Sequence, residues 1–254
     1  MKTQRIQSFS FFKSLLAFVV LGAGVANAQL VVPNAYTSTA ASTSGLNTFI
    51  RDTGNPRTGQ LLINANQLTS FIGQSIGSIS FRLFTGSTVA FPATAASWTD
   101  FTISIGQGVA FGSQTTTFAN NFVGSPTIVR SGPLTMNPGA FPVAPGDPNP
   151  FGTPIVFTLP FVYTGGNLLI EIRHTGSNIV NNAANDFLEV ALTTDPGFNS
   201  NFWAATATGN AATVGAVANF TVTQLNVIPE PSVALLLLVG GVGTWLLRKR
   251  RQAS

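Results

Sequence analysis

The chain contains no cysteine and only one histidine, His174, and only 8% of its 254 residues are charged. The lack of cysteine excludes disulfide bonds and thiolate metal sites. A single histidine also excludes a metal site built from several histidine ligands. About 200 residues is nevertheless long enough to bury a substantial core without cross-links. These absences therefore restrict the chemistry of the protein and not its ability to fold.

The few charges are unevenly distributed along the chain. They sum to +3 in residues 1–28, to −2 in residues 29–228 and to +3 in residues 229–254, which gives the net charge of +4. All the excess basic charge therefore lies at the two ends. The middle of the chain has no basic surface of the kind that binds nucleic acid, so we expect no nucleic-acid partner.

Residues 1–28 have the three parts of an export signal peptide. Three cations precede the apolar stretch SLLAFVVLGAGV, and the small residues Ala26 and Ala28 then occupy the two positions that a signal peptidase reads. We expect cleavage after Ala28, which leaves Gln29 as the first residue. The alternative is an uncleaved membrane helix, but an apolar stretch of 12 residues is short for a bilayer.

The C-terminal segment has a different order of parts. Residues 233–247, VALLLLVGGVGTWLL, contain no charge and predict a single transmembrane helix about 22 Å long. Two prolines precede this helix and prevent its extension toward the N-terminus. The cluster that follows it places the C-terminus in the cytoplasm by the positive-inside rule; this basic tail, 248–251, consists of Arg248, Lys249, Arg250 and Arg251. An ordinary single-pass anchor would show the same features.

The complete segment 229–254 resembles the PEP-CTERM sorting signal of exported proteins in Gram-negative bacteria that make exopolysaccharide. The motif is Pro229-Glu230-Pro231, followed by the short apolar helix and the basic tail. The resemblance implies recognition by an exosortase, a membrane protease–transpeptidase, and removal of the tail. It covers only about a tenth of the chain. We therefore expect transient passage through the inner membrane, then a location at the cell surface or in the extracellular matrix.

Residues 29–228 show the alternation of apolar and polar side chains that is typical of β-strands. The clearest examples are SISFRLF (78–84), TDFTISIG (99–106) and NLLIEIR (167–173). Ten or so short strands separated by polar turns predict an all-β fold, an antiparallel β-sandwich, as one ectodomain. Further candidate strands are NTFIR, GQLLINA, PTIVRS, PIVFTLPFVY, DFLEVALTT, FWAATA and ANFTVTQLNV.

Two segments of the ectodomain are expected to form loops. Residues 137–154 contain six prolines and three glycines in 18 residues, and residues 203–218 are rich in glycine, alanine and threonine. The first segment could also link two domains, but apolar strands resume on both sides of it. The succession of strands over roughly residues 46–195 is similar to jelly-roll-like ectodomains of bacterial surface proteins. That resemblance implies a fold and says little about activity.

Candidate catalytic and binding groups are few. We interpret His174 as a solvated residue just past a strand end, because no nucleophile motif accompanies it. The acids Glu171, Asp186, Glu189 and Asp195 could bind Ca²⁺ but lack the dense spacing of a calcium loop, so we expect separate surface acids or arginine partners. No pair of carboxylates stands out for glycoside hydrolysis. Four aromatic residues could stack on sugar rings if exposed, although core or rim packing is expected: Tyr36, Trp98, Tyr163 and Trp203.

The sequence thus predicts an exported structural or binding protein associated with exopolysaccharide, and neither an enzyme nor a cofactor-binding protein. Its domains are the signal peptide 1–28, the β-sandwich ectodomain 29–228 and the sorting signal 229–254. A carbohydrate-binding or adhesion module is the alternative. A secreted hydrolase is a third possibility and would require two carboxylates, or His174 with an acid and a serine, to converge in a cleft.

Overall fold

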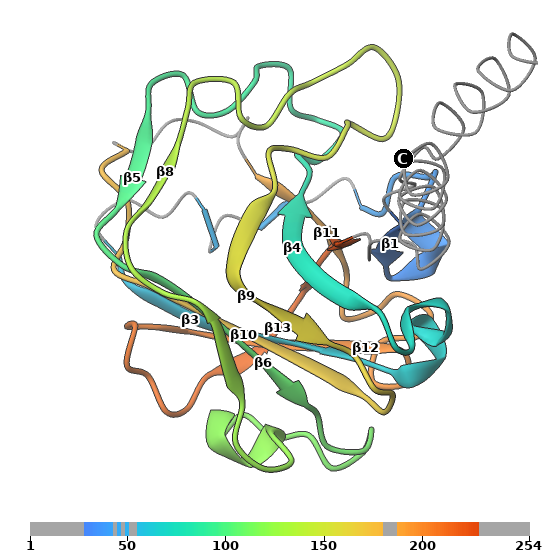
Figure 1. The fold of residues 1–254 in the computed structure, drawn as a ribbon. Coiled ribbons are helices and arrows are strands. Elements are labelled where there is room, and N and C mark those ends of the chain that lie inside the picture. Colours follow the sequence, from blue (N-terminus) through green and yellow to red (C-terminus); the bar gives the residue numbers. More distant parts are fainter. Residues whose placement is uncertain (1–27, 43–44, 47–48, 51–54, 180–186, 229–254) are drawn as a thin grey trace, which may run out of the picture. The chain divides into compact units, whose positions relative to one another are not determined.

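In the part of the chain that the structure describes, the regular structure consists of strands paired in antiparallel sheets, together with a few turns of 3₁₀ helix (Figure 1). The computed structural model describes residues 28–42, 45–46, 49–50, 55–179 and 187–228. No helix in these ranges is long and apolar enough to cross a membrane. Nearly all of the predicted leader and the whole of segment 229–254, with its proposed helix 233–247 and sorting motif, lie outside the described residues.

Fifteen strands are present in the described ranges, and residues 29–228 form a compact unit. Their bounds are β1 Gln29–Val32, β2 Gly45–Leu46, β3 Arg57–Ile63, β4 Ser75–Phe81, β5 Ala96–Trp98, β6 Phe101–Gln107, β7 Thr127–Arg130, β8 Leu134–Met136, β9 Ile155–Val162, β10 Leu168–His174, β11 Leu188–Ala191, β12 Phe202–Thr208, β13 Ala216–Ala218, β14 Phe220–Thr221 and β15 Thr223–Val227. The 3₁₀ helices are η1 Asn34–Tyr36, η2 Ala65–Gln67, η3 Thr69–Phe71 and η4 Phe118–Asn121.

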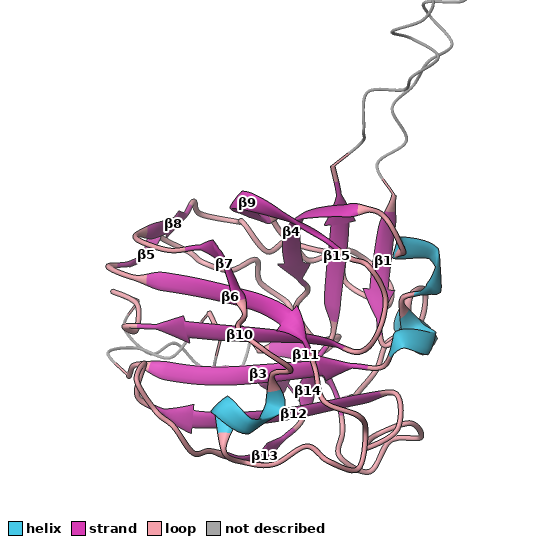
Figure 2. Ribbon diagram, turned by 60° about the horizontal axis from the view of Figure 1, so that its bottom comes forward, coloured by secondary structure: helices cyan, strands magenta, loops and turns pink. Residues whose placement is uncertain are grey.

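Two larger sheets carry most of the fold (Figure 2). One has four strands in the order β1-β15-β4-β9, and the other has six strands in the order β13-β12-β3-β10-β6-β7. Two smaller sheets, β14-β11-β2 and β5-β8, complete the described structure. Neighbouring strands often come from distant parts of the chain, and β15 therefore joins the end of the unit to β1 and β4 near its beginning.

The main core consists of apolar side chains from both larger sheets, as in a sandwich. In β10, Leu168, Ile170 and Ile172 face this core, because alternate residues of a strand point to the same side. The four-stranded sheet contributes side chains such as Ile79 and Leu225. Fully buried phenylalanines and one tryptophan fill the remaining space, as the aromatic content predicted.

The opposite face of the six-stranded sheet is also partly covered. Leu62 of β3, Leu169 of β10 and Trp203 of β12 form a second buried cluster with Phe118 of η4. A strand that is apolar on both faces is buried on both faces, which explains why LLI in β3 and LLI in β10 interrupt strict alternation.

Most of the predicted strands are confirmed, with three kinds of difference. The segment ANFTVTQLNV forms two strands, β14 and β15, that belong to different sheets. Phe49 and Ile50 of the candidate strand NTFIR lie in a turn. Strands β1, β2, β5, β8 and β13 were not predicted, and β12 and β13 occupy parts of the expected loop 203–218. Each unpredicted strand has at most four residues, which is too few to show a period.

The proline-rich segment 137–154 forms a long connection between β8 and β9 without a regular strand or helix, as predicted. It is held by isolated antiparallel bridges from Phe141 to Phe91 and from Phe151 to Arg82. The segment therefore packs against the rest of the compact unit formed by residues 29–228, to which it belongs.

We predict that Gly59→Ala destabilises the fold by about 1–3 kcal/mol through overpacking. A Cβ atom at Gly59 would lie 2.2 Å from Cε1 of Phe49, a side chain that is only 2% exposed and whose ring stacks on Phe81. Urea unfolding followed by circular dichroism measures the change. The matched control is Gly106→Ala, also in the six-stranded sheet, where the nearest atom is 3.1 Å away on the half-buried Phe122. Equal stability of Gly59→Ala and the wild type would contradict this packing.

Candidate functional site

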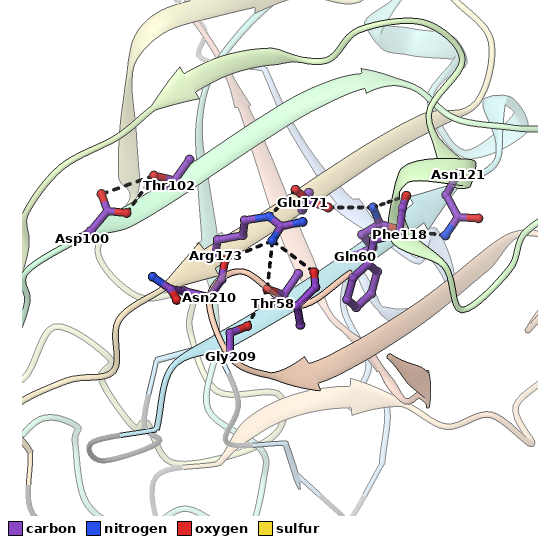
Figure 3. A network of polar contacts seen from close by, with 11 residues as sticks. Thr58, Gln60, Asp100, Thr102, Phe118, Asn121, Glu171, Arg173, Gly209 and Asn210 are labelled. Atoms are coloured by element: carbon purple, nitrogen blue, oxygen red, sulfur yellow. Dashed lines mark hydrogen bonds and ion pairs between the residues drawn. The ribbon is translucent and has the colours of Figure 1, made fainter. Parts of the chain in front are cut away.

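Six polar residues lie together on the outer face of the six-stranded sheet and form what we call the polar strip. Figure 3 labels all of them except Ser104. Strand register brings Thr58, Arg173 and Thr102 into one row across β3, β10 and β6. The next row consists of Gln60, Glu171 and Ser104. In both rows the residues of β10 lie between those of β3 and β6, so their charges sit in the middle of the strip.

Glu171 is held at both carboxylate oxygens. Its Oε1 accepts a hydrogen bond from Nε of Arg173 at 2.6 Å, and its Oε2 accepts one from Nε2 of Gln60 at 2.9 Å. The side chain of Glu171 is 10% exposed and that of Arg173 is 27% exposed. Both carboxylate oxygens of Glu171 are therefore occupied by partners within the protein.

The strip holds two covering loops in place. Nη1 of Arg173 donates to the carbonyl oxygens of Asn210 and Ala212 at 3.0 and 3.2 Å, in the turn that follows β12. Nε2 of Gln60 donates to the carbonyl oxygen of Phe118 at 3.0 Å, and its Oε1 accepts from Asn121 at 2.8 Å. These bonds satisfy buried polar groups beneath η4. The strip therefore holds η4, which covers the second apolar cluster, against the sheet.

A second polar network is centred on the buried ion pair of Arg82 and Glu189, whose side chains are 1% and 0% exposed. Nη2 of Arg82 also donates to the carbonyl oxygens of Tyr36 and Thr39 at 2.8 and 2.9 Å, and the backbone N–H of Ala41 donates to Glu189. The guanidinium lies 5.0 Å from the ring centre of Phe151. Arg82 directly follows β4 and Glu189 lies in β11. The pair therefore holds segment 36–41 and the long connection 137–154 against these two strands.

Tyr36 links this ion pair to a third acid. Its hydroxyl donates to Oδ2 of Asp195 at 2.8 Å, while its carbonyl oxygen accepts from Arg82. Burial, reinforced by the hydrogen bond to Asp195, raises the pKa of Tyr36 from 10.0 to about 12. The phenol consequently remains a neutral donor over the whole physiological range.

His174 is not the solvated residue that we expected. It ends β10 with no exposed surface, its ring stacks on Phe101 at a centroid distance of 5.7 Å, and its Nδ1 accepts from the N–H of Gly176 at 3.0 Å. The prediction was wrong because His174 continues the alternation of Ile170 and Ile172 and so points into the core.

The expected alternatives for the candidate acids were separate surface acids or arginine partners. Glu171 and Glu189 are arginine partners, and neither is a surface acid. Asp195 bonds to Tyr36 and to the N–H of Leu192, and Asp186 lies outside the described residues. Within the described ranges, no group of three or more acidic or histidine side chains could hold a metal ion.

The candidate sugar-binding aromatics are packed in the protein. Trp98, Tyr163 and Trp203 are at most 2% exposed, which confirms core packing, and Tyr36 is half-buried. In the part of the chain that the structure describes, every exposed large apolar side chain is aliphatic. The described surface therefore lacks the exposed aromatic platform on which a sugar ring would stack.

Sequence reasoning missed the partners of these networks. Gln60 and Asn121 had no signal of their own, because their value depends on neighbours far away in the chain. Arg82 had the signal of an alternating strand and was placed on its polar side, but the burial of that side was not foreseen.

Comparison with protein-family models and with curated protein sequences finds no match for this chain. The candidate site consequently rests on its own geometry.

We predict that Glu189→Gln destabilises the protein by about 3–5 kcal/mol, because it leaves the charge of Arg82 buried without a counter-ion. The matched control is Glu171→Gln, which removes the same charge from a pair whose arginine is partly exposed. We expect the control to lose less than half as much stability, since water screens the remaining charge. Denaturant unfolding of both variants at neutral pH tests the comparison. Equal losses would show that the two pairs are equivalent.

We also predict a loss of stability between pH 10 and about 12 that depends on Tyr36. The unfolded chain releases the phenolic proton near its ordinary pKa of 10.0, whereas the folded protein retains it until about 12, so rising pH favours unfolding across this window. Residues 29–228 contain no lysine, and burial also raises the pKa of the other tyrosine, Tyr163, so a comparison with a variant that lacks only Tyr36 is needed to separate the two phenols.

The test compares wild type with Tyr36→Phe in denaturant unfolding across this pH window. The variant should lose less stability above pH 10, and the two proteins should show the same pH dependence at lower pH. Parallel curves throughout would mean that Tyr36 is not protected from ionisation.

Proposed function

We propose that this chain is an exported bacterial protein that is processed at both ends and acts as a structural component of the cell surface or the exopolysaccharide matrix. The observation that carries the proposal is the pairing of β1 with β15, in which Gln29 lies opposite Asn226 (Figure 2). The compact unit begins at Gln29, directly after the proposed signal-peptidase site, and ends at Ile228, directly before Pro229-Glu230-Pro231. Removal of both end segments would take no strand from the fold.

The resemblance of segment 229–254 to a PEP-CTERM signal supports an exosortase as the processing partner. In this proposal the short helix 233–247 holds the precursor in the inner membrane and the tail is a transient handle. Ile228 N–H still donates to the carbonyl oxygen of Ser75 at 2.8 Å, so the folded unit reaches to the first residue of the motif.

For the fold, we propose a jelly-roll-like sandwich as the finer class. The support is the facing of two antiparallel sheets across one core and the long-range exchange of strands between neighbours, as in β1-β15-β4. A jelly-roll has two sheets of four strands, and this chain would add further strands to one sheet.

The surface chemistry favours a structural role over a lectin that stacks aromatic rings on sugars. The four-stranded sheet presents the amides of Gln29, Gln224 and Asn226, which are exposed or partly exposed. Gln224 bonds to Gln29 and to the buried Ser80, and Asn226 bonds to the buried Ser78. Such groups exchange hydrogen bonds with water or polysaccharide without bringing charge. We propose no catalytic residue and no cofactor, because the described acids are held in separate contacts.

Intact-mass measurement of the exported protein, in hosts with and without the exosortase, tests the proposal. We expect a product that starts at Gln29 and lacks the sequence LLRKRRQAS in the host with the enzyme, and a product that retains this tail in the host without it. The same mass in both hosts, or the presence of Met1 in the exported product, would refute processing.

Binding to the host's own exopolysaccharide distinguishes the alternative of a carbohydrate-binding module. We expect weak retention of the processed protein that is insensitive to substitution of any one aromatic residue. Strong, saturable retention lost in one aromatic variant with an unchanged unfolding midpoint would favour the binding module instead.

A further inference from the structure

One end of the four-stranded sheet gathers both termini of the compact unit, and we call it the exit end. It is defined by Gln29 at the start of β1, Ser75 at the start of β4, Val162 at the end of β9, Ile228 just after β15, and Ile72 before β4. Register places these residues together: Val162 lies opposite Ser75, and Ile228 N–H bonds to Ser75. Ile72 adjoins this row, because the next residue, Gly73, donates to Tyr163.

The exit end is apolar at its surface. Ile72, Val162 and Ile228 are 57%, 53% and 43% exposed, although each is a large aliphatic side chain. Isolated exposed aliphatics are common, but here three of them share one end of a sheet.

The same end also has no charged side chain, so the α-amino group that cleavage after Ala28 would create at Gln29 would be its only ionic group among the described residues. No charged residue occurs in 58–81, 148–170 or 196–229, the segments that contain β4, β9 and β15, nor in β1. An uncharged surface can approach the membrane interface without the cost of desolvating an ion. The exit end therefore lacks the charged side chains that usually keep a protein surface in water and away from lipid.

The chain allows very little distance between this end and the proposed membrane helix. Ile228 is fixed by its bond to Ser75 and by its side chain, which fills the space above Gly77. Five residues then lead to Val233, a reach of at most about 17 Å even when fully extended. While the tail is in a bilayer, the exit end must lie near the lipid headgroups.

We propose that the exit end is a membrane-docking surface of the precursor, and that Ile72, Val162 and Ile228 enter the lipid interface while the tail is in place. The proposal rests on the membrane insertion of the tail in the proposed function. The partner is the lipid surface itself, because the tether brings these side chains to lipid and their chemistry offers nothing to a charged ligand.

The natural lack of cysteine permits a direct test with single-cysteine variants of the full-length precursor. Ile72→Cys and Val162→Cys are labelled with an environment-sensitive fluorophore and reconstituted in phosphatidylcholine vesicles with and without headgroup spin-labelled lipid. The matched controls are Val89→Cys and Val214→Cys, which are 57% and 55% exposed. Val89 lies in the connection that follows the opposite end of β4, and that end is roughly 20 Å from Ser75 along the seven-residue strand. A label at Thr244 reports whether the tail itself inserts.

We expect the quencher to reduce fluorescence at positions 72, 162 and 244 and to leave positions 89 and 214 unchanged. Quenching at 244 alone would overturn the docking surface and leave the anchor proposal intact. No quenching at 244 would overturn both. Equal quenching at all five positions would show non-specific adsorption and overturn the proposal. Quenching at 72 and 162 that needs exosortase in the vesicles would assign the surface to the enzyme and would overturn it as well.

Discussion

The antiparallel ladder between β1 and β15 determines where both ends of the folded unit lie. Gln29 pairs with Asn226 and Val32 pairs with Thr223, so the chain enters β1 and leaves β15 at the same end of these two strands. Because β15 is also paired with β4, this exit is built into the interior of the sheet and not into a loose terminal strand. In the proposed function, the protein is first held at a membrane and later cut, and this arrangement suits both steps. Both proposed cuts fall at the same end of β1 and β15, and neither removes a residue of the β1–β15 ladder.

A second constraint is that the chain has few charged residues. The fold uses four of them in two ion pairs that are wholly or largely buried. Arg82 with Glu189 and Arg173 with Glu171 each join a strand to loops that cover it. Breaking such a pair costs far more than it contributes as a whole, so these contacts fix a unique arrangement of the loops more than they add net stability. The described outer surface then has few charges, such as that of Asp147, and consists mainly of hydroxyls, amides and aliphatic side chains. Its hydroxyls and amides bind water without giving the protein a field that attracts charged partners.

The strands could be predicted where alternation extends over about seven residues, as in β4, β6 and β10. The same alternation correctly separates Phe101, Ile103 and Ile105 from Thr102 and Ser104. It does not reveal that the second face of a sheet is covered. For this reason Arg82 was expected on an open polar face, although it is buried. His174 was expected in solvent because it was placed past the end of the strand, whereas it is the last residue of β10 and continues the alternation of Ile170 and Ile172 into the core. The polar strip could not be predicted either, because Gln60 and Glu171 are separated by 111 residues and meet only through the pairing of β3 with β10.

The size of the exit end bears on what happens when the tail is removed. Full burial of an aliphatic side chain contributes about 1.5–3 kcal/mol, so three side chains that are roughly half exposed in the folded protein add about 3 kcal/mol on entering the lipid interface. That is weaker than a millimolar affinity, which corresponds to about 4 kcal/mol. The exit end can therefore orient the precursor while the tail supplies an intramolecular tether, but it cannot hold the processed protein on the membrane by itself. Cleavage at Pro229-Glu230-Pro231 would then be sufficient to release the folded unit, with no separate step needed to detach the docking surface.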